Sequence, residues 1–417
     1  MMMQSCRRLV TDLSHKSRLL TAGVLAGRNK RFCTSKPLTD LSEDEQMLQD
    51  AVRKFRKEQL EPRTREFEEA RDFPPDIVKQ LFDQGWLGIR VPTQYDGPGA
   101  DFFSAVVVIE EISKTDPALG AAVDLQNTLI AGVVLDYGSE EQKKKYLSKF
   151  ANSMFGSFCL SEEGSGSDAF AMKTTALRSG DHYIINGNKL WITSAHMAGA
   201  FLVMANAAPE EGYKGITCFI VDADTPGVSV PRREEKLGQH AVSNCPVTFE
   251  NVKVPASNIV GEIGSGYKII ASTLNEGRIG VAAQMVGAAQ GILDHVIPYT
   301  MERKQFGKRL FDFQAMQHQI AEATVQVEAA RLLAYNAARL HECNMPYVKE
   351  AAMAKYYSTE MACQIGLKGI KWMGALGYMK DFPIEKFLRD IIPGTIYEGA
   401  SNVMLNTIAG RVAKEYQ

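Results

Sequence analysis

The chain has 417 residues, of which 45% are hydrophobic and 23% charged, enough for a large core and more than one domain. The formal net charge is −2 and basic runs are not interleaved with aromatic residues, so the composition gives no reason to expect a nucleic-acid partner. The seven cysteines include no C-x-x-C pair and the seven histidines no H-E-x-x-H motif, which argues against a disulfide framework and against a metal site.

Residues 1–33 differ from the rest of the chain. They carry seven lysines and arginines but one acid, Asp12, and are rich in Ser and Leu. This composition is typical of a mitochondrial targeting segment, and a plain basic tail is the alternative. The apolar run at 19–27 is far shorter than the roughly 20 residues that a membrane helix needs. We therefore expect a protein of the mitochondrial matrix without a membrane span.

Residues 38–155 have the pattern of a helical domain. Ser42 to Glu45 form a capping box ahead of an apolar helix face. Further helices are predicted at 103–114 and within 119–150, and prolines separate the segments.

Residues 156–266 have the pattern of a β domain. Short β-rich runs occur at 157–160, 182–185, 189–193, 201–205, 216–221 and 247–254. Turn signals such as Asn186-Gly187-Asn188 and Thr225-Pro226-Gly227 separate them. We expect an antiparallel barrel or sandwich.

Residues 267–417 are predicted to be helical again. A long helix at 313–342 is expected from Met316, Ile320, Ala323, Val327 and Ala330, which recur at helical spacing. A last helix carries Met404, Ile408 and Val412. The predicted fold class is therefore α+β, with a helical, a β and a second helical domain.

A glycine-rich motif at 164–169 matches G-x-G-x-x-A, the phosphate-binding pattern of dinucleotide folds. That pattern requires a helix directly after the glycines, and residues 172–177 read as a strand instead. We therefore reject a Rossmann fold, although the loop's backbone N–H groups can still meet a phosphate or a flavin.

Four blocks resemble the signatures of the acyl-CoA dehydrogenase family, in the family's order and spacing: CLSEEGSGSD at 159–168, LWIT at 190–193, ERKQFG at 302–307 and IYEGASN at 396–402. The resemblance covers residues 38–417. It implies an N-terminal helical domain, a middle antiparallel β-barrel and a C-terminal four-helix bundle. It also implies a homotetramer that holds FAD and passes electrons to electron-transferring flavoprotein. The implied reaction is α,β-dehydrogenation of a short or branched acyl-CoA such as 2-methylbutyryl-CoA, in isoleucine and fatty acid catabolism.

The resemblance implies that Glu398 is the catalytic base. Without it, a Glu in a loop would ordinarily be a solvated surface residue. Glu276 is the rival, because some relatives carry the base directly before an Arg on the first helix of the C-terminal domain. Here Gly277 stands before Arg278, and Glu276 is one residue off, about 100° around a helix. We therefore favour Glu398.

The resemblance assigns further residues to the cofactor and the substrate. Cofactor contacts are expected from Phe158, Leu160, Ser161, Gly166, Ser167, Trp191, Ile192, Thr193, Arg303, Phe306, Gln314, Lys371, Gly374, Ala375, Ala400, Ser401 and Asn402. Arg303 and Gln314 are expected to reach the FAD of a neighbouring subunit. Contacts with the acyl-CoA are expected from Ser167, Tyr213, Tyr267, Asn275, Glu276, Gly277, Arg278 and Gly399. The ordinary alternatives are core packing for Trp191, a solvated helix charge for Arg303 and loop packing for the two tyrosines.

Two positions depart from the family pattern. Ala375 adds a methyl group where close backbone approach to FAD is expected. His240 stands where relatives often have Arg, so an ion pair that stabilises the β domain is expected to be lost. Three alternatives stay open: a relative that acts on isobutyryl-CoA or on straight short chains, an acyl-CoA oxidase, and a non-catalytic scaffold of the same fold.

Overall fold

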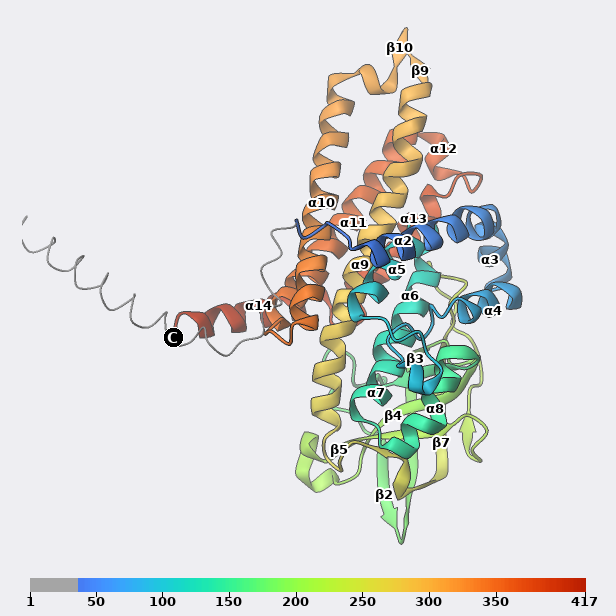
Figure 1. The fold of residues 1–417 in the computed structure, drawn as a ribbon, viewed down its shortest axis with the longest axis vertical. Coiled ribbons are helices and arrows are strands. Elements are labelled where there is room, and N and C mark those ends of the chain that lie inside the picture. The colour runs from blue at the N-terminus through green and yellow to red at the C-terminus, as the bar shows by residue number, and fades with distance from the viewer. Residues whose placement is uncertain (1–36) are drawn as a thin grey trace, which may run out of the picture. The chain divides into compact units, whose positions relative to one another are not determined.

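The computed structural model describes residues 37–417, so the predicted targeting segment at 1–33 lies outside the described residues. Residues Leu41–Gln417 form one compact unit. Along this unit a helical region, a β region and a second helical region follow one another, which is the predicted order (Figure 1).

The first region is built from short helices with polar caps. Ser42 and Glu45 form the predicted capping box of α2, and Asp101 and Asp116 cap α5 and α6. The α-helices are α2 (Glu43–Phe55), α3 (Thr64–Ala70), α4 (Pro75–Asp83), α5 (Phe102–Ser113), α6 (Pro117–Leu125), α7 (Gly132–Tyr137) and α8 (Glu140–Asn152).

The segment Pro117–Tyr137 is long and apolar enough to cross a membrane by length and composition. In the structure, however, 89% of its most apolar window is buried inside the protein, as is usual for the core helix of a folded domain.

The β region forms one eight-stranded sheet in the order β6-β7-β3-β2-β4-β5-β8, with β1 paired to β4. Its strands are β1 (Phe155–Cys159), β2 (Thr175–Ser179), β3 (His182–Thr193), β4 (Ala198–Asn206), β5 (Ile216–Asp222), β6 (Val228–Ser229), β7 (Asn244–Pro255) and β8 (Ile259–Val260). Most pairings are antiparallel as expected, but β1 and β2 pair with β4 in parallel, so the sheet is mixed.

Two local predictions about the β region were wrong. Asn186-Gly187-Asn188 does not separate two strands but lies inside β3, where a register shift against β7 absorbs the irregularity. Gly187 is extended there, and a side chain would collide with Thr174. The strand predicted at 172–177 begins later, at Thr175. No helix follows the glycine-rich motif, in agreement with the rejection of a Rossmann fold.

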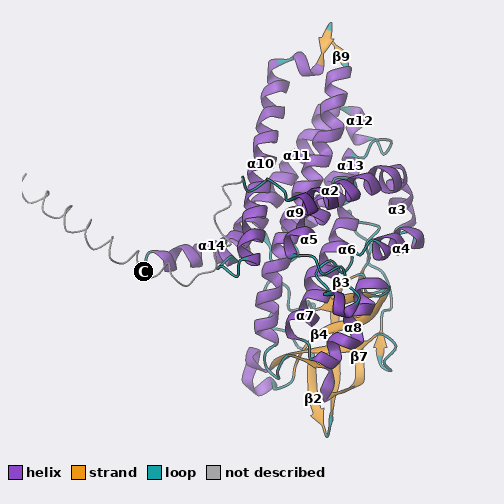
Figure 2. Ribbon diagram, in the orientation of Figure 1, coloured by secondary structure: helices purple, strands orange, loops and turns teal. Residues whose placement is uncertain are grey.

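The sheet curls around its own core. Alternate residues of β4, including Phe201 and Val203, share one cluster with Ile185 of β3 and Val247 of β7. The residues between them on β4, such as Leu202, face the helices α7 and α8. In Figure 2 these strands lie together in the lower part of the view, where α7 and α8 overlap them.

The last region consists of three long helices and three shorter ones. These are α9 (Gly266–Glu302), α10 (Gln314–Glu342), α11 (Val348–Met373), α12 (Ala375–Tyr378), α13 (Ile384–Ile391) and α14 (Ser401–Glu415). The short strands β9 (Lys304–Gln305) and β10 (Lys308–Arg309) form a hairpin between α9 and α10. The helices α9, α10 and α11 pack along one another, and α14 packs against α11 (Figure 1). Most of the predicted apolar positions of α10 are buried, among them Ile320 and Val327.

Candidate active site

A glycine face on helix α9 receives two carboxylates from other parts of the chain. A β-carbon built at Gly277 would lie 2.0 Å from Oε2 of Glu398, so this carboxylate rests directly on the helix backbone. A β-carbon at Gly280 would lie 1.9 Å from Oδ1 of Asp124 on α6. Residues three apart share one face of a helix, so the two carboxyl groups are neighbours.

Glu398 stands in a backbone conformation that side chains rarely adopt. Its φ is +53° and that of Gly399 is +102°, so two successive residues are left-handed just before α14. The turn is held by two cations. Arg278 Nε of α9 donates to the carbonyl oxygen of Glu398 over 3.2 Å, and Lys355 Nζ of α11 donates to that of Gly399 over 2.6 Å. Packing and these two bonds together fix the turn.

One oxygen of the Glu398 carboxylate is held out of water, although the residue as a whole is only partly buried. Its Oε2 atom is buried and has no hydrogen-bond partner among residues 37–417. Burial raises the pKa of Glu398 from 4.5 to about 7, although the charges of Lys355 and Arg278 act in the opposite direction. A carboxylate with these properties is a suitable general base near neutral pH.

Asp124 is a second buried carboxyl group beside the first. Burial, followed by the charge of Glu398, holds the pKa of Asp124 well above its usual value. The Thr128 hydroxyl lies 2.8 Å from the backbone oxygen of Asp124 and 3.1 Å from its Oδ1. The hydrogen bond from Thr128 acts in the opposite direction, because a donor stabilises the ionised carboxylate, but burial and the charge of Glu398 outweigh it. The raised pKa favours the protonated form of Asp124.

The rival base, Glu276, has different surroundings. Arg90 donates to its Oε2 over 2.5 Å, and a ring nitrogen of His341 lies 3.0 Å from its Oε1. These partners lower its pKa even though burial acts to raise it. Glu276 therefore stays ionised with both oxygens engaged, which is unsuitable for a base that must take up a proton.

The expected flavin residues of the β region lie together at the ends of β1 and β3. Leu190 N donates to the oxygen of Ser161 over 2.9 Å, and Ser157 Oγ donates to the oxygen of Thr193 over 2.7 Å. Between them, Trp191 has a φ of +58° and is 54% exposed, so the alternative of core packing was wrong. Phe158, Leu160 and Ile192 are buried beneath, whereas Gly166 and Ser167 are exposed on the adjoining loop. An exposed indole flanked by partly buried hydroxyl groups fits a planar, polar ring such as isoalloxazine.

The remaining expected cofactor residues lie in three other places. Arg303, Phe306 and Gln314 are exposed at or beside the β9–β10 hairpin, with Phe306 95% exposed. Lys371, Gly374 and Ala375 are exposed where α11 gives way to α12, and Ala400, Ser401 and Asn402 begin α14. In Figure 1 the hairpin lies at the opposite end of α9 from the sheet. The structure therefore does not bring the hairpin to the β1–β3 site within one chain.

The expected acyl-CoA residues line α9 from its first turn. Tyr213 and Tyr267 pack edge to face, 5.4 Å between ring centroids, with Phe170 6.0 Å from Tyr213. Tyr213 is 49% exposed, so this aromatic cluster opens to solvent. Further along, Arg278 donates to Asn275 over 2.8 Å in addition to its bond to the carbonyl oxygen of Glu398.

His240 keeps a contact where the loss of an ion pair was expected. Its Nδ1 lies 2.9 Å from Oε1 of Glu68, and Arg389 donates to the same oxygen over 2.6 Å. The expected loosening of the β region at this position therefore finds no support.

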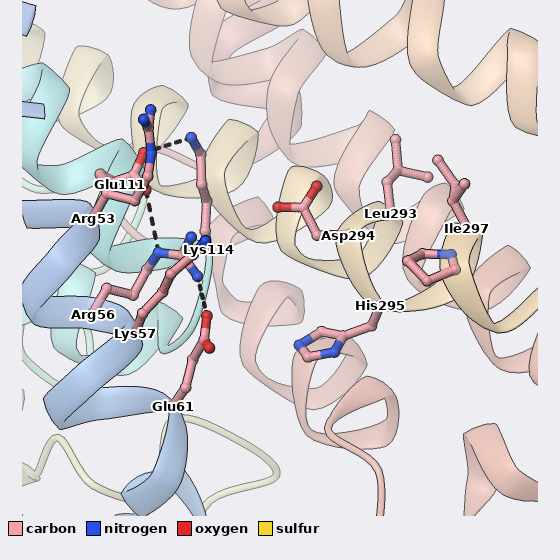
Figure 3. A pocket seen from close by; sticks show the side chains of 11 residues that line it. Arg53, Arg56, Lys57, Glu61, Glu111, Lys114, Leu293, Asp294, His295 and Ile297 are labelled. Atoms are coloured by element: carbon pink, nitrogen blue, oxygen red, sulfur yellow. Dashed lines mark hydrogen bonds and ion pairs between the residues drawn. The ribbon is translucent and has the colours of Figure 1, made fainter. Parts of the chain in front are cut away.

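A pocket of about 600 Å³ lies elsewhere, between α2 and the turns that follow it, α5 and the far half of α9 (Figure 3). Its charged groups are largely paired, because Glu111 accepts from both Arg56 and Lys114. It contains neither Glu398 nor Asp124, so it is separate from the site described above.

Comparison with known proteins finds relatives along most of the chain. Profiles of the acyl-CoA dehydrogenase N-terminal, middle and C-terminal domains match residues 42–153, 157–252 and 264–413. The chain belongs to the acyl-CoA dehydrogenase family. Among curated relatives, the mitochondrial short/branched chain specific acyl-CoA dehydrogenase of Bos taurus is 55% identical over 91% of this chain and 88% of its own length.

Solved structures of other family members have the same fold as this acyl-CoA dehydrogenase. Butyryl-CoA dehydrogenase from Megasphaera elsdenii superposes with a TM-score of 0.88 at 32% identity, covering 90% of this chain and 99% of that one. A glutaryl-CoA dehydrogenase from Mycobacterium smegmatis, solved in complex with FADH2, gives 0.85 at 28% identity over 90% and 95%. FAD is the cofactor of the family, and this oxidoreductase depends on it.

The motifs of this acyl-CoA dehydrogenase did not reveal two groups beside Glu398, namely Asp124 and Lys355. Both are buried ionisable residues inside apolar helical runs, Asp124 within AAVDLQ and Lys355 within AAMAKY. An ionisable residue at such a position is rarely buried without a reason, and this was the signal available in the sequence.

Proposed function

We propose that this acyl-CoA dehydrogenase oxidises a short or branched acyl-CoA, such as 2-methylbutyryl-CoA, to the trans-2-enoyl-CoA, with Glu398 as the base. The observation that carries the proposal is the buried, unpartnered Oε2 of Glu398 on the Gly277 face of α9. The similarity to a short/branched chain specific relative over most of the chain supports this substrate class.

The α proton of a thioester is only weakly acidic, so the base needs a high proton affinity and little water around it. Glu398 meets both needs, because burial raises its pKa to about 7. Its free Oε2 takes the α proton, and the carboxylate becomes a carboxylic acid. A protonated, uncharged Glu398 is tolerated in this site. Asp124, whose raised pKa favours its neutral form, adds no second charge there.

When bound, FAD supplies the acceptor for the hydride that leaves the β carbon. Trp191, Ser161 and Thr193 at the ends of β1 and β3 would hold its ring system, since they offer an exposed aromatic face with hydroxyl donors beside it. Arg303 and Gln314 would bind the FAD of a neighbouring subunit in a homotetramer. Their exposed position, away from the β1–β3 site of the same chain, supports that arrangement.

Tyr213, Tyr267 and Asn275 would bind the CoA part of the substrate. Tyr267 and Asn275 precede Gly277 along α9, and Tyr213 packs against Tyr267, so the thioester would reach the base from the side of the open aromatic cluster. We further propose that the enzyme works in the mitochondrial matrix and passes its electrons to electron-transferring flavoprotein. The mitochondrial relative and the basic, acid-poor residues 1–33 support this location.

The test is to purify the full chain, record its absorption spectrum and measure turnover with an artificial electron acceptor. The substrate panel is 2-methylbutyryl-CoA, isobutyryl-CoA and butyryl-CoA. A flavin spectrum with the highest kcat/KM for 2-methylbutyryl-CoA is expected. Preference for another member of the panel would correct the substrate, and a flavoprotein inert towards all three would refute the proposal. Hydrogen peroxide formed at the rate of turnover in air would indicate an oxidase instead.

A further inference from the structure

The turn that carries the proposed base is pinned by two cations at consecutive carbonyl groups. Arg278 binds the carbonyl of Glu398 and Lys355 that of Gly399, and both residues have positive φ. The two cations come from different helices, α9 and α11. Neither bonds to the carboxylate itself, since no ion pair joins them to Glu398 within the described residues.

Lys355 is an unusual lysine. Its side chain is 0% exposed, and its ammonium makes one hydrogen bond, to Gly399, and no ion pair within residues 41–417. An ammonium has three donors, and a buried charge is costly unless something compensates for it. A negative charge near Lys355 must therefore offset part of this cost, although it forms no ion pair with the ammonium.

Glu398 is the group that fits best, because its charge acts on Lys355 more strongly than that of Glu360 on the same helix. Among the charged residues that face its carboxylate are Lys355 from α11, Arg278 from α9 and Asp124 from α6, with the phenol of Tyr397 next to it in the chain. Burial raises the pKa of Asp124 and so favours its neutral form, which leaves the two cations as the charges that stabilise an ionised Glu398. Because they bind backbone oxygens instead, Oε2 stays free to accept a proton.

We propose that Lys355 is a positioning residue of the reaction, which fixes the Glu398–Gly399 turn and places an uncovered positive charge beside the base. The inference rests on Glu398 being that base. Burial lowers the pKa of Lys355 from 10.5 to about 8, and the charge of Glu398 opposes the shift, so the lysine is cationic at neutral pH. The charge of Lys355 favours the ionised form of Glu398, and its hydrogen bond to Gly399 holds the Glu398 side chain in place.

The experiment compares the pH dependence of kcat/KM from pH 5.5 to 8 for three replacements in the FAD-loaded enzyme. Lys355→Met removes both charge and donor, so its acid limb should move up by about one pH unit or more. Its kcat should also fall at least about tenfold, with a smaller change in KM, because the base is displaced. Lys355→Gln keeps a donor for Gly399 and should show the shift with a smaller loss of kcat. Lys355→Arg keeps the positive charge, so the acid limb of its kcat/KM profile should lie at the wild-type pH.

Lys368→Met is the matched control, because it removes a lysine from the same helix that is paired with Glu322 and lies roughly 20 Å further along. It should leave the profile unchanged. If flavin-loaded Lys355→Met keeps the wild-type limb within about 0.3 unit, the inference is overturned. If that variant does not fold, an unshifted limb in Lys355→Gln overturns it equally. Wild-type turnover that survives Glu398→Gln would instead refute the proposed function, whatever the lysine variants do.

Discussion

Replacing Glu398 by Gln should make the protein more stable at alkaline pH while abolishing turnover. Gln has the shape of a neutral Glu but cannot ionise. In the folded protein the pKa of Glu398 is raised from 4.5 to about 7. The raised pKa therefore adds to the free energy of unfolding as long as Glu398 is protonated. This contribution is complete below about pH 4.5 and is lost as the pH rises through 7. The shift corresponds to about 3 kcal/mol, which the wild type loses and the variant keeps.

The assay is urea unfolding of both proteins at pH 5 and pH 8.5, at equal protein concentration and with saturating FAD. The two should differ little at pH 5, and the variant should be more stable by about 3 kcal/mol at pH 8.5. Replacement of the exposed Glu58 by Gln controls for the general loss of one negative charge. A variant that gains no stability between the two pH values would show that Glu398 is not a desolvated carboxylate.

Three further substitutions test the site and its scaffold. Gly277→Ala should lower kcat at least about 100-fold with FAD retained, because its β-carbon would lie 2.0 Å from the Glu398 carboxylate; a near-normal kcat would contradict the described contact. Asp124→Asn should leave the acid limb of the pH–rate profile in place, because Asp124 is already neutral; a shift of one unit to lower pH would show that it is ionised. Lys189 on β3 is buried and forms an ion pair with the buried Glu162 over 2.8 Å. Lys189→Met should lower the free energy of unfolding in urea by about 3–5 kcal/mol, because it leaves Glu162 buried without a partner; a change below about 1 kcal/mol would contradict this cost.

The secondary structure was largely readable from local patterns. The Ser42 capping box, the long helix with Ile320 and Val327 on its buried side and the β-rich runs all correspond to elements of the structure. The failures came from tertiary contacts. Gly187 reads as a turn residue, yet Thr174 packs where its side chain would be and the strand continues through it. The parallel pairing of β1 with β4 joins two segments that are separated in the sequence, so no local pattern contains it.

The candidate site was only partly predictable for the same reason. Motif resemblance supplied Glu398 and Trp191, which lie within two of the four blocks. The surroundings that give Glu398 its properties come from residues far apart in the chain, such as Asp124 and Lys355. Their role follows from burial and proximity, which only the folded structure defines.

The order in which the chain is made has a consequence for this site. Glu398, the proposed base, is separated by 120 residues from Arg278, which binds its carbonyl oxygen. At ordinary rates of translation the ribosome needs roughly 6–24 s to cover that stretch. A chain interrupted within it contains Gly277 and Arg278 but not the carboxylate that rests on this face of α9 in the folded protein. The proposed base is thus among the last parts of the site to be synthesised.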